Sequence, residues 1–226
     1  MLWWVCQVRA NLHYNECINN DLNRDRTVSE EVICRMYKHL NIPCYYEEWD
    51  YIEIYHRKSV DCTNTSLMQD ISNMDYRKYC DNILYQVSKE CIDMPQDNPH
   101  HTLSVSRHMY YTFDKLREDR NPNIHMQIAA LLHDIGKPFC KFFKDGGRYA
   151  NYYNHDNVSA QLAVNYLCSC NLHTPDILKI AQYIQLHMVL LHTQLNDKSL
   201  DKLKLKLGDQ LFNDIVEFNT ADKCAI

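Results

Sequence analysis

A histidine followed directly by an aspartate, His133-Asp134, is the pair of residues in this sequence that points most clearly to chemistry. The pair follows the apolar run Ile128–Leu132, which we expect to be a buried helix. Two ionisable groups at the end of a buried helix need a partner, because the burial of an unpaired charge is costly. Imidazole and carboxylate groups are common ligands of divalent metal ions, so a metal ion would satisfy both residues.

Other residues that can bind a metal ion or a phosphate are spread over the same half of the sequence. They are His108, His155, His187 and Asp222. Each has an ordinary structural interpretation when taken singly, because a lone helix histidine is usually a hydrogen-bonded polar residue and an aspartate after a helix is often a cap. A common site therefore depends on the whole ordered set and not on any one of these residues.

The ordered set resembles the HD superfamily of metal-dependent phosphohydrolases. The segments His133-Asp-Ile-Gly-Lys-Pro138 and Tyr153-Asn-His155-Asp-Asn-Val-Ser-Ala160 are most similar to the HD domain that follows bacterial tRNA nucleotidyltransferases and to similar phage-type domains. Asn154 stands where those domains usually have glycine. The resemblance covers about residues 98–226, and its strength lies in the order of several motifs.

The resemblance implies a ligand set for one or two divalent ions. His108, His133, Asp134 and Asp222 would bind one ion, which could be Mn, Mg, Fe, Co, Ni or Zn, since the set contains no thiolate. His155 and His187 match histidines that bind a second ion in two-metal members, where Asp134 would bridge both ions. Phosphate contact is an equally open role for these two histidines.

The same resemblance gives Asp134 and Lys137 catalytic roles. A metal ion lowers the pKa of bound water near neutral pH, and Lys137 would neutralise charge that develops on the phosphate. The structural alternative for Lys137 is a charge near a helix C-terminus. His101, Arg107 and His155 are further candidates for substrate contacts, although His101 and Arg107 could as well be surface residues.

The implied activity is phosphomonoester or phosphodiester hydrolysis of a nucleotide, a cyclic phosphate or an RNA end. The alternative is a regulatory module that keeps the metal site and binds a nucleotide or RNA end without cleaving it. A structural or interaction protein is a third hypothesis, and it requires the histidines to be dispersed. The expected partner under the first two hypotheses is a phosphorylated small molecule or the end of a nucleic acid.

A loop with basic and aromatic residues follows the His-Asp motif. Residues 139–153 contain Lys141, Lys144 and Arg148 among phenylalanines and tyrosines. Such a mixture can hold a phosphate and stack a base, and it is also typical of a solvated surface loop. Both interpretations remain open from the sequence.

The hydrophobic pattern predicts a mainly α fold, with an all-helical bundle over residues 98–226 and a small α+β segment over residues 1–94. Met94–Pro99 marks the boundary, because it contains two prolines and no apolar periodicity. Apolar residues at helical spacing predict five helices beyond it. These are Ser104–Arg117, Asn123–Asp134, Asn157–Leu172, Pro175–Leu191 and Leu207–Thr220.

The N-terminal segment shows patterns of structure but no pattern of chemistry. A helix is expected to begin near Ser29 and to end before Pro43, one or two strands are expected within Cys44–Tyr55, and a further helix over Asp75–Lys89. Ser29–Pro43 and the tyrosine-rich stretch after it loosely resemble part of HipA-like kinase domains. The glycine-rich loop, the catalytic aspartate and the metal-binding aspartate of that fold are not evident, so the expected role is a scaffold, a surface for a second copy or another protein, or a remnant.

Composition narrows the class of protein further. The chain has 226 residues, of which 46% are hydrophobic, which is enough for a packed core. Its net charge of -5 argues against attachment to nucleic acid by bulk charge alone. The opening residues lack a basic stretch and a long apolar run, and the eleven cysteines show no disulfide pattern, so we expect a cytoplasmic protein that spans no membrane.

Overall fold

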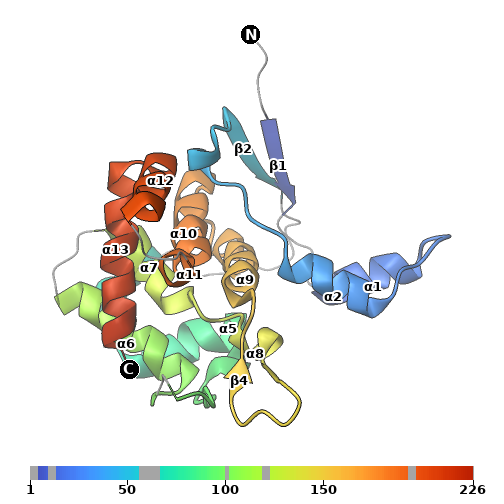
Figure 1. Cartoon of the computed structure of the whole chain (residues 1–226), viewed down its shortest axis with the longest axis horizontal. Coiled ribbons are helices and arrows are strands. Elements are labelled where there is room, and N and C mark those ends of the chain that lie inside the picture. The colour runs from blue at the N-terminus through green and yellow to red at the C-terminus, as the bar shows by residue number, and fades with distance from the viewer. Residues whose placement is uncertain are drawn as a thin grey trace.

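The computed structural model describes residues 5–9, 14–55, 67–99, 102–118, 123–192 and 197–225, and it is mostly helical (Figure 1). The predicted mainly α fold, with a small α+β part before the bundle, is confirmed. Five longer helices build the bundle: α6 (Val105–Glu118), α7 (Ile124–Leu132), α9 (His155–Ser169), α10 (Thr174–Leu186) and α13 (Asp209–Cys224).

Helix α7 lies at the centre of the bundle, packed against α6, α9, α10 and α13. It begins at Asn123, whose side chain accepts a hydrogen bond from the Met126 amide. Every residue from Ile128 to Leu132 is buried. A helix that is apolar on all sides belongs in a protein interior, and this one carries His133 and Asp134 into the interior at its C-terminal end.

The segment predicted as a loop after the His-Asp motif contains regular structure instead. Helix α8 (Lys137–Cys140) comes first, and strands β3 (Phe142–Phe143) and β4 (Ala150–Asn151) then form an antiparallel hairpin. Strands of two residues are too short to show the alternation that identifies a strand in a sequence.

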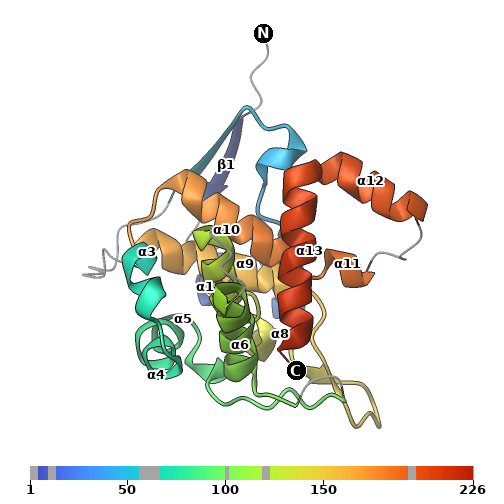
Figure 2. The same ribbon diagram turned by 90° about the vertical axis from the view of Figure 1, so that its left-hand side faces the viewer.

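The predicted helix Pro175–Leu191 is interrupted at His187, after which α11 (Val189–His192) follows. The His187 Nδ1 atom lies 2.6 Å from the Ile184 carbonyl oxygen. The imidazole thus donates a hydrogen bond to a carbonyl group in the last turn of α10. Helix α12 (Asp197–Leu207) has no counterpart among the predicted helices and crosses one end of α13 (Figure 2).

The N-terminal part consists of two helices and a pair of strands. Strands β1 (Val5–Arg9) and β2 (Tyr51–Tyr55) are parallel, and α1 (Tyr14–Leu22), α2 (Glu30–Lys38) and the short 3-10 helix η1 (Tyr45–Glu47) lie between them in the chain. The Cys44–Tyr55 segment thus contributes a single strand. The α1–α2 pair projects from the bundle (Figure 1).

A helical segment with several short turns connects this part to the bundle. Its elements are α3 (Leu67–Asp70), η2 (Ile71–Asn73), α4 (Tyr76–Tyr79), the π-helical turn η3 (Cys80–Leu84), α5 (Tyr85–Val87) and η4 (Lys89–Cys91). Asp75 begins the helical run, because its side chain accepts from the Lys78 amide at 2.8 Å. The predicted helix Asp75–Lys89 is therefore present, with a π-helical turn in its middle.

Buried side chains from both sides of the predicted boundary belong to one hydrophobic cluster. Ile52, Tyr79 and Leu84 from the first part join Met109 and Leu131 from the bundle. The division at residues 94–98 stays a prediction, and the packing joins the two parts into a shared core. Among the described residues, no helix combines the length and the apolar character that crossing a bilayer requires.

Candidate metal centre

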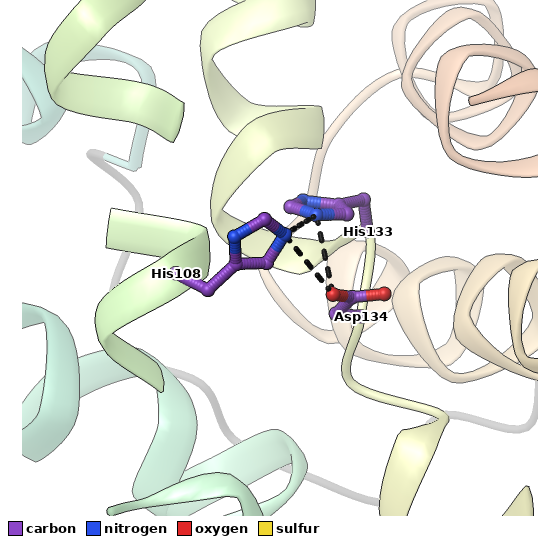
Figure 3. A group of neighbouring side chains, drawn as sticks. All are labelled: His108, His133 and Asp134. Carbon is purple, nitrogen blue, oxygen red and sulfur yellow. Dashed lines mark hydrogen bonds and ion pairs between the residues drawn. The ribbon is translucent and has the colours of Figure 1, made fainter. Parts of the chain in front are cut away.

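Six ionisable side chains from five places in the chain converge inside the bundle. His108 lies on α6, His133 and Asp134 in the turn after α7, His155 at the start of α9, His187 directly after α10 and Asp222 near the end of α13. All six side chains are buried. Figure 3 shows three of them, with the His108 and His133 rings turned toward each other and toward the Asp134 carboxylate. The structure thus brings together all six predicted ligands.

The turn that carries His133 and Asp134 is supported by hydrogen bonds to its carbonyl groups. The Tyr79 hydroxyl donates to the Leu131 carbonyl at 2.6 Å, and the Ser88 hydroxyl donates to the Ile135 carbonyl at 3.1 Å. These carbonyls have no partner within the helix, because α7 ends there. Residues from the N-terminal part therefore stabilise the turn that holds the candidate ligands.

Gly136 lets the same turn approach α9 very closely. A Cβ atom at this position would lie 2.7 Å from the His155 carbonyl oxygen and 2.7 Å from the Ser159 amide nitrogen. The Gly136 amide also donates to the Ser159 hydroxyl at 2.9 Å. The glycine is thus required by close packing, and this packing sets the position of His155 relative to Asp134.

The four imidazoles share one arrangement of their ring nitrogens. Each Nδ1 atom lies 2.6–2.8 Å from a backbone carbonyl oxygen, to which it donates. The carbonyls belong to Ala225 for His108, Ala130 for His133, Tyr152 for His155 and Ile184 for His187. A carbonyl at Nδ1 fixes the proton there, so the Nε2 lone pair is directed at the centre, as in metal-binding histidines.

The Asp134 Oδ2 atom faces the first group of ligands. It lies 3.4 Å from His108 Nε2 and 3.4 Å from His133 Nε2. Asp222 Oδ1 approaches the same two nitrogens, at 2.9 and 3.2 Å. This group, which we call the Oδ2 side, therefore consists of two imidazoles (His108 and His133) and two carboxylates (Asp134 and Asp222).

The Asp134 Oδ1 atom faces a second group. His155 Nε2 lies 3.1 Å from this oxygen and His187 Nε2 lies 3.8 Å from it, while the two ring nitrogens are 3.2 Å apart. We call this group the Oδ1 side. His108, His133 and Asp134 on the Oδ2 side, and Asp134, His155 and His187 on the Oδ1 side, each have ligand atoms within 4.8 Å of one another, a spacing that could hold a cation. Asp134 is common to both groups.

The electrostatics of the two sides differ. Burial alone would lower the pKa of His133, but the carboxylates of Asp134 and Asp222 overcome it and raise that pKa to about 10. Burial, together with the nearby His133 and His155, lowers the pKa of His187 to about 3.

The charge on the carboxylates is strongly favoured. Burial opposes ionisation of Asp134 and Asp222, yet the adjacent cationic and hydrogen-bonding groups hold both pKa values well below the usual range. Two of their oxygens are buried among ionisable groups, since Asp134 Oδ2 lies 2.6 Å from Lys137 Nζ and Asp222 Oδ1 lies 2.9 Å from His108 Nε2. Converging imidazole lone pairs and buried, ionised carboxylate oxygens fit a divalent cation, and the nitrogen and oxygen donors suit several first-row metals.

Lys137 is buried beside this centre, at the start of α8. Its Nζ atom lies 2.6 Å from Asp134 Oδ2 and donates to Gln96 Oε1, also at 2.6 Å. The Nζ atom also lies 5.5 Å from the centre of the Tyr152 ring, and the Tyr152 hydroxyl donates to the Gln96 carbonyl. A single ammonium group is thus held between the candidate ligand and a buried amide.

Gln96 and Tyr152 were not among the predicted site residues. Gln96 lies in the proline-rich stretch that marks the predicted boundary, and Tyr152 is one of several tyrosines before His155. Neither position carries a sequence signal that would separate it from its neighbours. Only the fold brings both of them to Lys137.

Arg107, one of the predicted substrate contacts, is not joined to the centre. Arg107 is exposed, pairs with Asp93 at 3.6 Å and lies over the ring of Tyr76. His101 lies outside the described residues. The substrate-binding roles of both residues stay predictions.

Fold and site together define a mainly helical protein with buried His and Asp groups that could hold a metal ion. Over 92 residues the chain is 32% identical to the A-adding tRNA nucleotidyltransferase of Deinococcus radiodurans. This match covers 39% of the chain and 21% of the relative, so the chain matches about a fifth of that protein's length. No family model and no solved structure matches the chain.

Proposed function

We propose that the chain is a divalent-metal-dependent phosphohydrolase of the HD type, which acts on a phosphomonoester or phosphodiester of a nucleotide, a cyclic phosphate or an RNA end. One observation carries the proposal. Four buried imidazoles have their Nδ1 protons bonded to carbonyls, and their Nε2 atoms converge on the Asp134 carboxylate. The partial similarity to a protein named as a tRNA nucleotidyltransferase is consistent with a phosphorylated or nucleic-acid substrate.

The ligand roles follow from the positions of the side chains. His108, His133, Asp134 and Asp222 would hold one ion, and Asp134, His155 and His187 would hold a second. A bound divalent ion supplies Lewis-acid activation of water and of a phosphoryl oxygen. Carbonyls at each Nδ1 atom keep the histidine rings oriented for this role, as partners behind metal ligands usually do.

Lys137 would bind the phosphate. Its ammonium lies directly beside Asp134 Oδ2, so a phosphoryl group brought to the centre would come within its reach. An ammonium in a water-poor site stabilises the negative charge that develops during phosphoryl transfer. Gln96 would keep the Lys137 side chain extended toward the centre, because it accepts a hydrogen bond from Nζ.

The test is reconstitution with defined metals. The protein is stripped with a chelator, loaded separately with Mn²⁺, Mg²⁺, Fe²⁺, Co²⁺, Ni²⁺ or Zn²⁺, and its metal content is measured. Hydrolysis is then followed with bis-p-nitrophenyl phosphate, nucleotides and 2′,3′-cyclic nucleotides. We expect turnover with at least one metal and none in the chelated protein.

A matched control uses a histidine outside the centre. His125 Nε2 pairs with Asp176 at 2.8 Å, and neither residue is among the candidate ligands, so His125→Ala should leave metal content and turnover unchanged. His133→Ala should lose both. Metal bound in the centre without turnover on any substrate would exclude the phosphohydrolase and leave the binding module, whereas the absence of bound metal would exclude both.

A further inference from the structure

The β3–β4 hairpin exposes a group of aromatic side chains next to the candidate centre. The four rings are Phe142, Phe143, Tyr149 and Tyr153, with exposed fractions of 38%, 50%, 51% and 55%. The Phe142 and Tyr153 rings are in contact, with centroids 5.4 Å apart. Exposed large apolar side chains that lie together often mark a binding surface. The hairpin extends away from the bundle (Figure 1).

Cationic side chains alternate with these rings. Lys144 Nζ lies 5.6 Å from the centre of the Tyr153 ring, and Lys141 Nζ lies 5.9 Å from that of Phe143. Residues 141–153 contain Lys141, Lys144 and Arg148 but a single acid, Asp145, in a chain whose net charge is -5. Lys141 Nζ is paired with the Asp97 carboxylate at 2.6 Å, so Lys144 and Arg148 supply the positive charge that would attract a polyanion.

The base of the hairpin is hydrogen-bonded to residues 95–97, the segment whose Gln96 accepts a hydrogen bond from Lys137. The Ala150 amide donates to the Asp97 carbonyl at 2.8 Å, and Lys141 Nζ donates to the Pro95 carbonyl at 3.0 Å. Between these two contacts lies Gln96, which accepts from Lys137. A ligand on the hairpin would therefore lie within a short distance of the candidate phosphate-binding lysine.

We propose that the hairpin is a binding platform for single-stranded nucleic acid, whose bases stack on Phe142, Phe143, Tyr149 and Tyr153 while its backbone follows Lys144 and Arg148. Alternating aromatic and cationic side chains are the usual means of binding single strands without sequence preference. The platform deepens the proposed function, on which it rests, because it selects the end of a strand over a free nucleotide as the substrate of the centre.

Binding is tested on the full chain in the presence of a chelator, where hydrolysis cannot occur. The probe is a fluorescein-labelled single-stranded RNA of about eight nucleotides, within the usual site size of such platforms, and a duplex of the same length is the comparison. Fluorescence anisotropy should show tighter binding of the single strand, since the bases of a duplex are not free to stack on the hairpin.

Two hairpin variants and their controls separate stacking from charge. Phe143→Ala should weaken binding of the RNA by about 5- to 100-fold, because loss of one stacking ring costs that much, and Phe143→Tyr should restore it. Tyr85→Ala, which removes an aromatic ring that is 68% exposed on α5, should have no effect. Lys144→Gln should lower the slope of log affinity against log salt by about one. Lys202→Gln is the matched control, because Lys202 is exposed on α12, and it should leave this slope unchanged.

Several outcomes would overturn the platform. These are no binding of the RNA by the wild type, equal binding by the wild type and Phe143→Ala, or loss of self-association in Phe143→Ala with unchanged RNA binding. Hydrolysis of bis-p-nitrophenyl phosphate by the metal-loaded wild type is measured separately. RNA binding without such hydrolysis would refute the proposed function alone, and hydrolysis without RNA binding would refute the platform alone.

Discussion

The two sides of the Asp134 carboxylate contain the same types of residue but not the same charge. The Oδ2 side has two imidazoles and the carboxylates of Asp134 and Asp222, whereas the Oδ1 side has two imidazoles and only the second oxygen of Asp134. The pKa of His133 on the Oδ2 side is raised to about 10, and that of His187 on the Oδ1 side is lowered to about 3. Burial and the nearby His133 and His155 dominate the pKa of His187, whereas the carboxylates of Asp134 and Asp222 outweigh burial at His133.

The same difference bears on metal binding. Each ionised carboxylate attracts a cation, so the side with two carboxylates should bind a divalent ion more tightly than the side with one carboxylate oxygen. Metal affinity depends on the charge count of the ligands as well as on their type. We therefore expect the Oδ2 side to fill first and the Oδ1 side to fill at higher metal concentration.

Replacement of Asp134, the residue that both sides share, should have the largest effect. Asp134→Asn should reduce metal binding at both sides and bring phosphohydrolysis to background. It should also destabilise the metal-free protein by about 3–5 kcal/mol, because removal of one partner leaves Lys137 as an uncompensated buried charge. Metal content, turnover and urea unfolding measure the three effects.

A double variant gives the control for stability. If the buried ammonium is the cause, Asp134→Asn combined with Lys137→Met should recover part of the lost free energy of unfolding, without recovery of metal binding. No recovery in the double variant would mean that the loss arises elsewhere in the bundle.

Replacement of Asp222 should affect the Oδ2 side alone. Asp222→Asn removes one of the two carboxylates there, so affinity for the first ion should fall by more than the roughly 10- to 100-fold that loss of a residue behind a metal ligand costs. Isothermal titration calorimetry with Mn²⁺ would then show two sites of similar affinity. A tight first site that persists in Asp222→Asn would remove the charge-count explanation.

The side chains that converge at the centre could be selected from the sequence, whereas the residues that orient them could not. His108, the His133-Asp134 pair and Asp222 keep a recognisable order, because each position is tied to one helix of the bundle. Gln96 is a single glutamine between two prolines, and its partner Lys137 lies 41 positions further along the chain. Such a contact depends on tertiary structure and leaves no periodic or local signal.

The β1–β2 pairing and helix α12 were likewise not predicted from local sequence patterns. The parallel pairing of Val5–Arg9 with Tyr51–Tyr55 joins segments that are separated by two helices, and each strand is too short to predict its partner. In α12 a signal was present, since Leu200, Leu203 and Leu207 follow helical spacing. The many lysines between them make the helix resemble a solvated linker.

Replacement of His187 should affect the Oδ1 side alone, and its effect on turnover should be smaller. His187→Ala removes a ligand from the Oδ1 side only, so metal content should fall from two ions to one while affinity for the first ion is kept. Turnover should decrease and not vanish, because the Oδ2 side keeps all four of its ligands. A variant that still binds two ions, with its fold verified by circular dichroism, would show that the Oδ1 side is not a metal site.

Gln96→Leu should have the smallest effect, since it acts through Lys137 and not through a ligand. The hydrogen bond from Lys137 Nζ to Gln96 Oε1 is of a kind worth about 1 kcal/mol, so kcat should fall roughly fivefold with both metal affinities unchanged. Gln86→Leu is the matched control, because Gln86 lies exposed on α5 and bonds only locally to the Asn82 carbonyl. If Gln96→Leu instead weakened the first metal site alone, Lys137 would be acting on the Oδ2 side through Asp134 and not on the phosphate, and the difference between the two sides would then include the lysine as well as the second carboxylate.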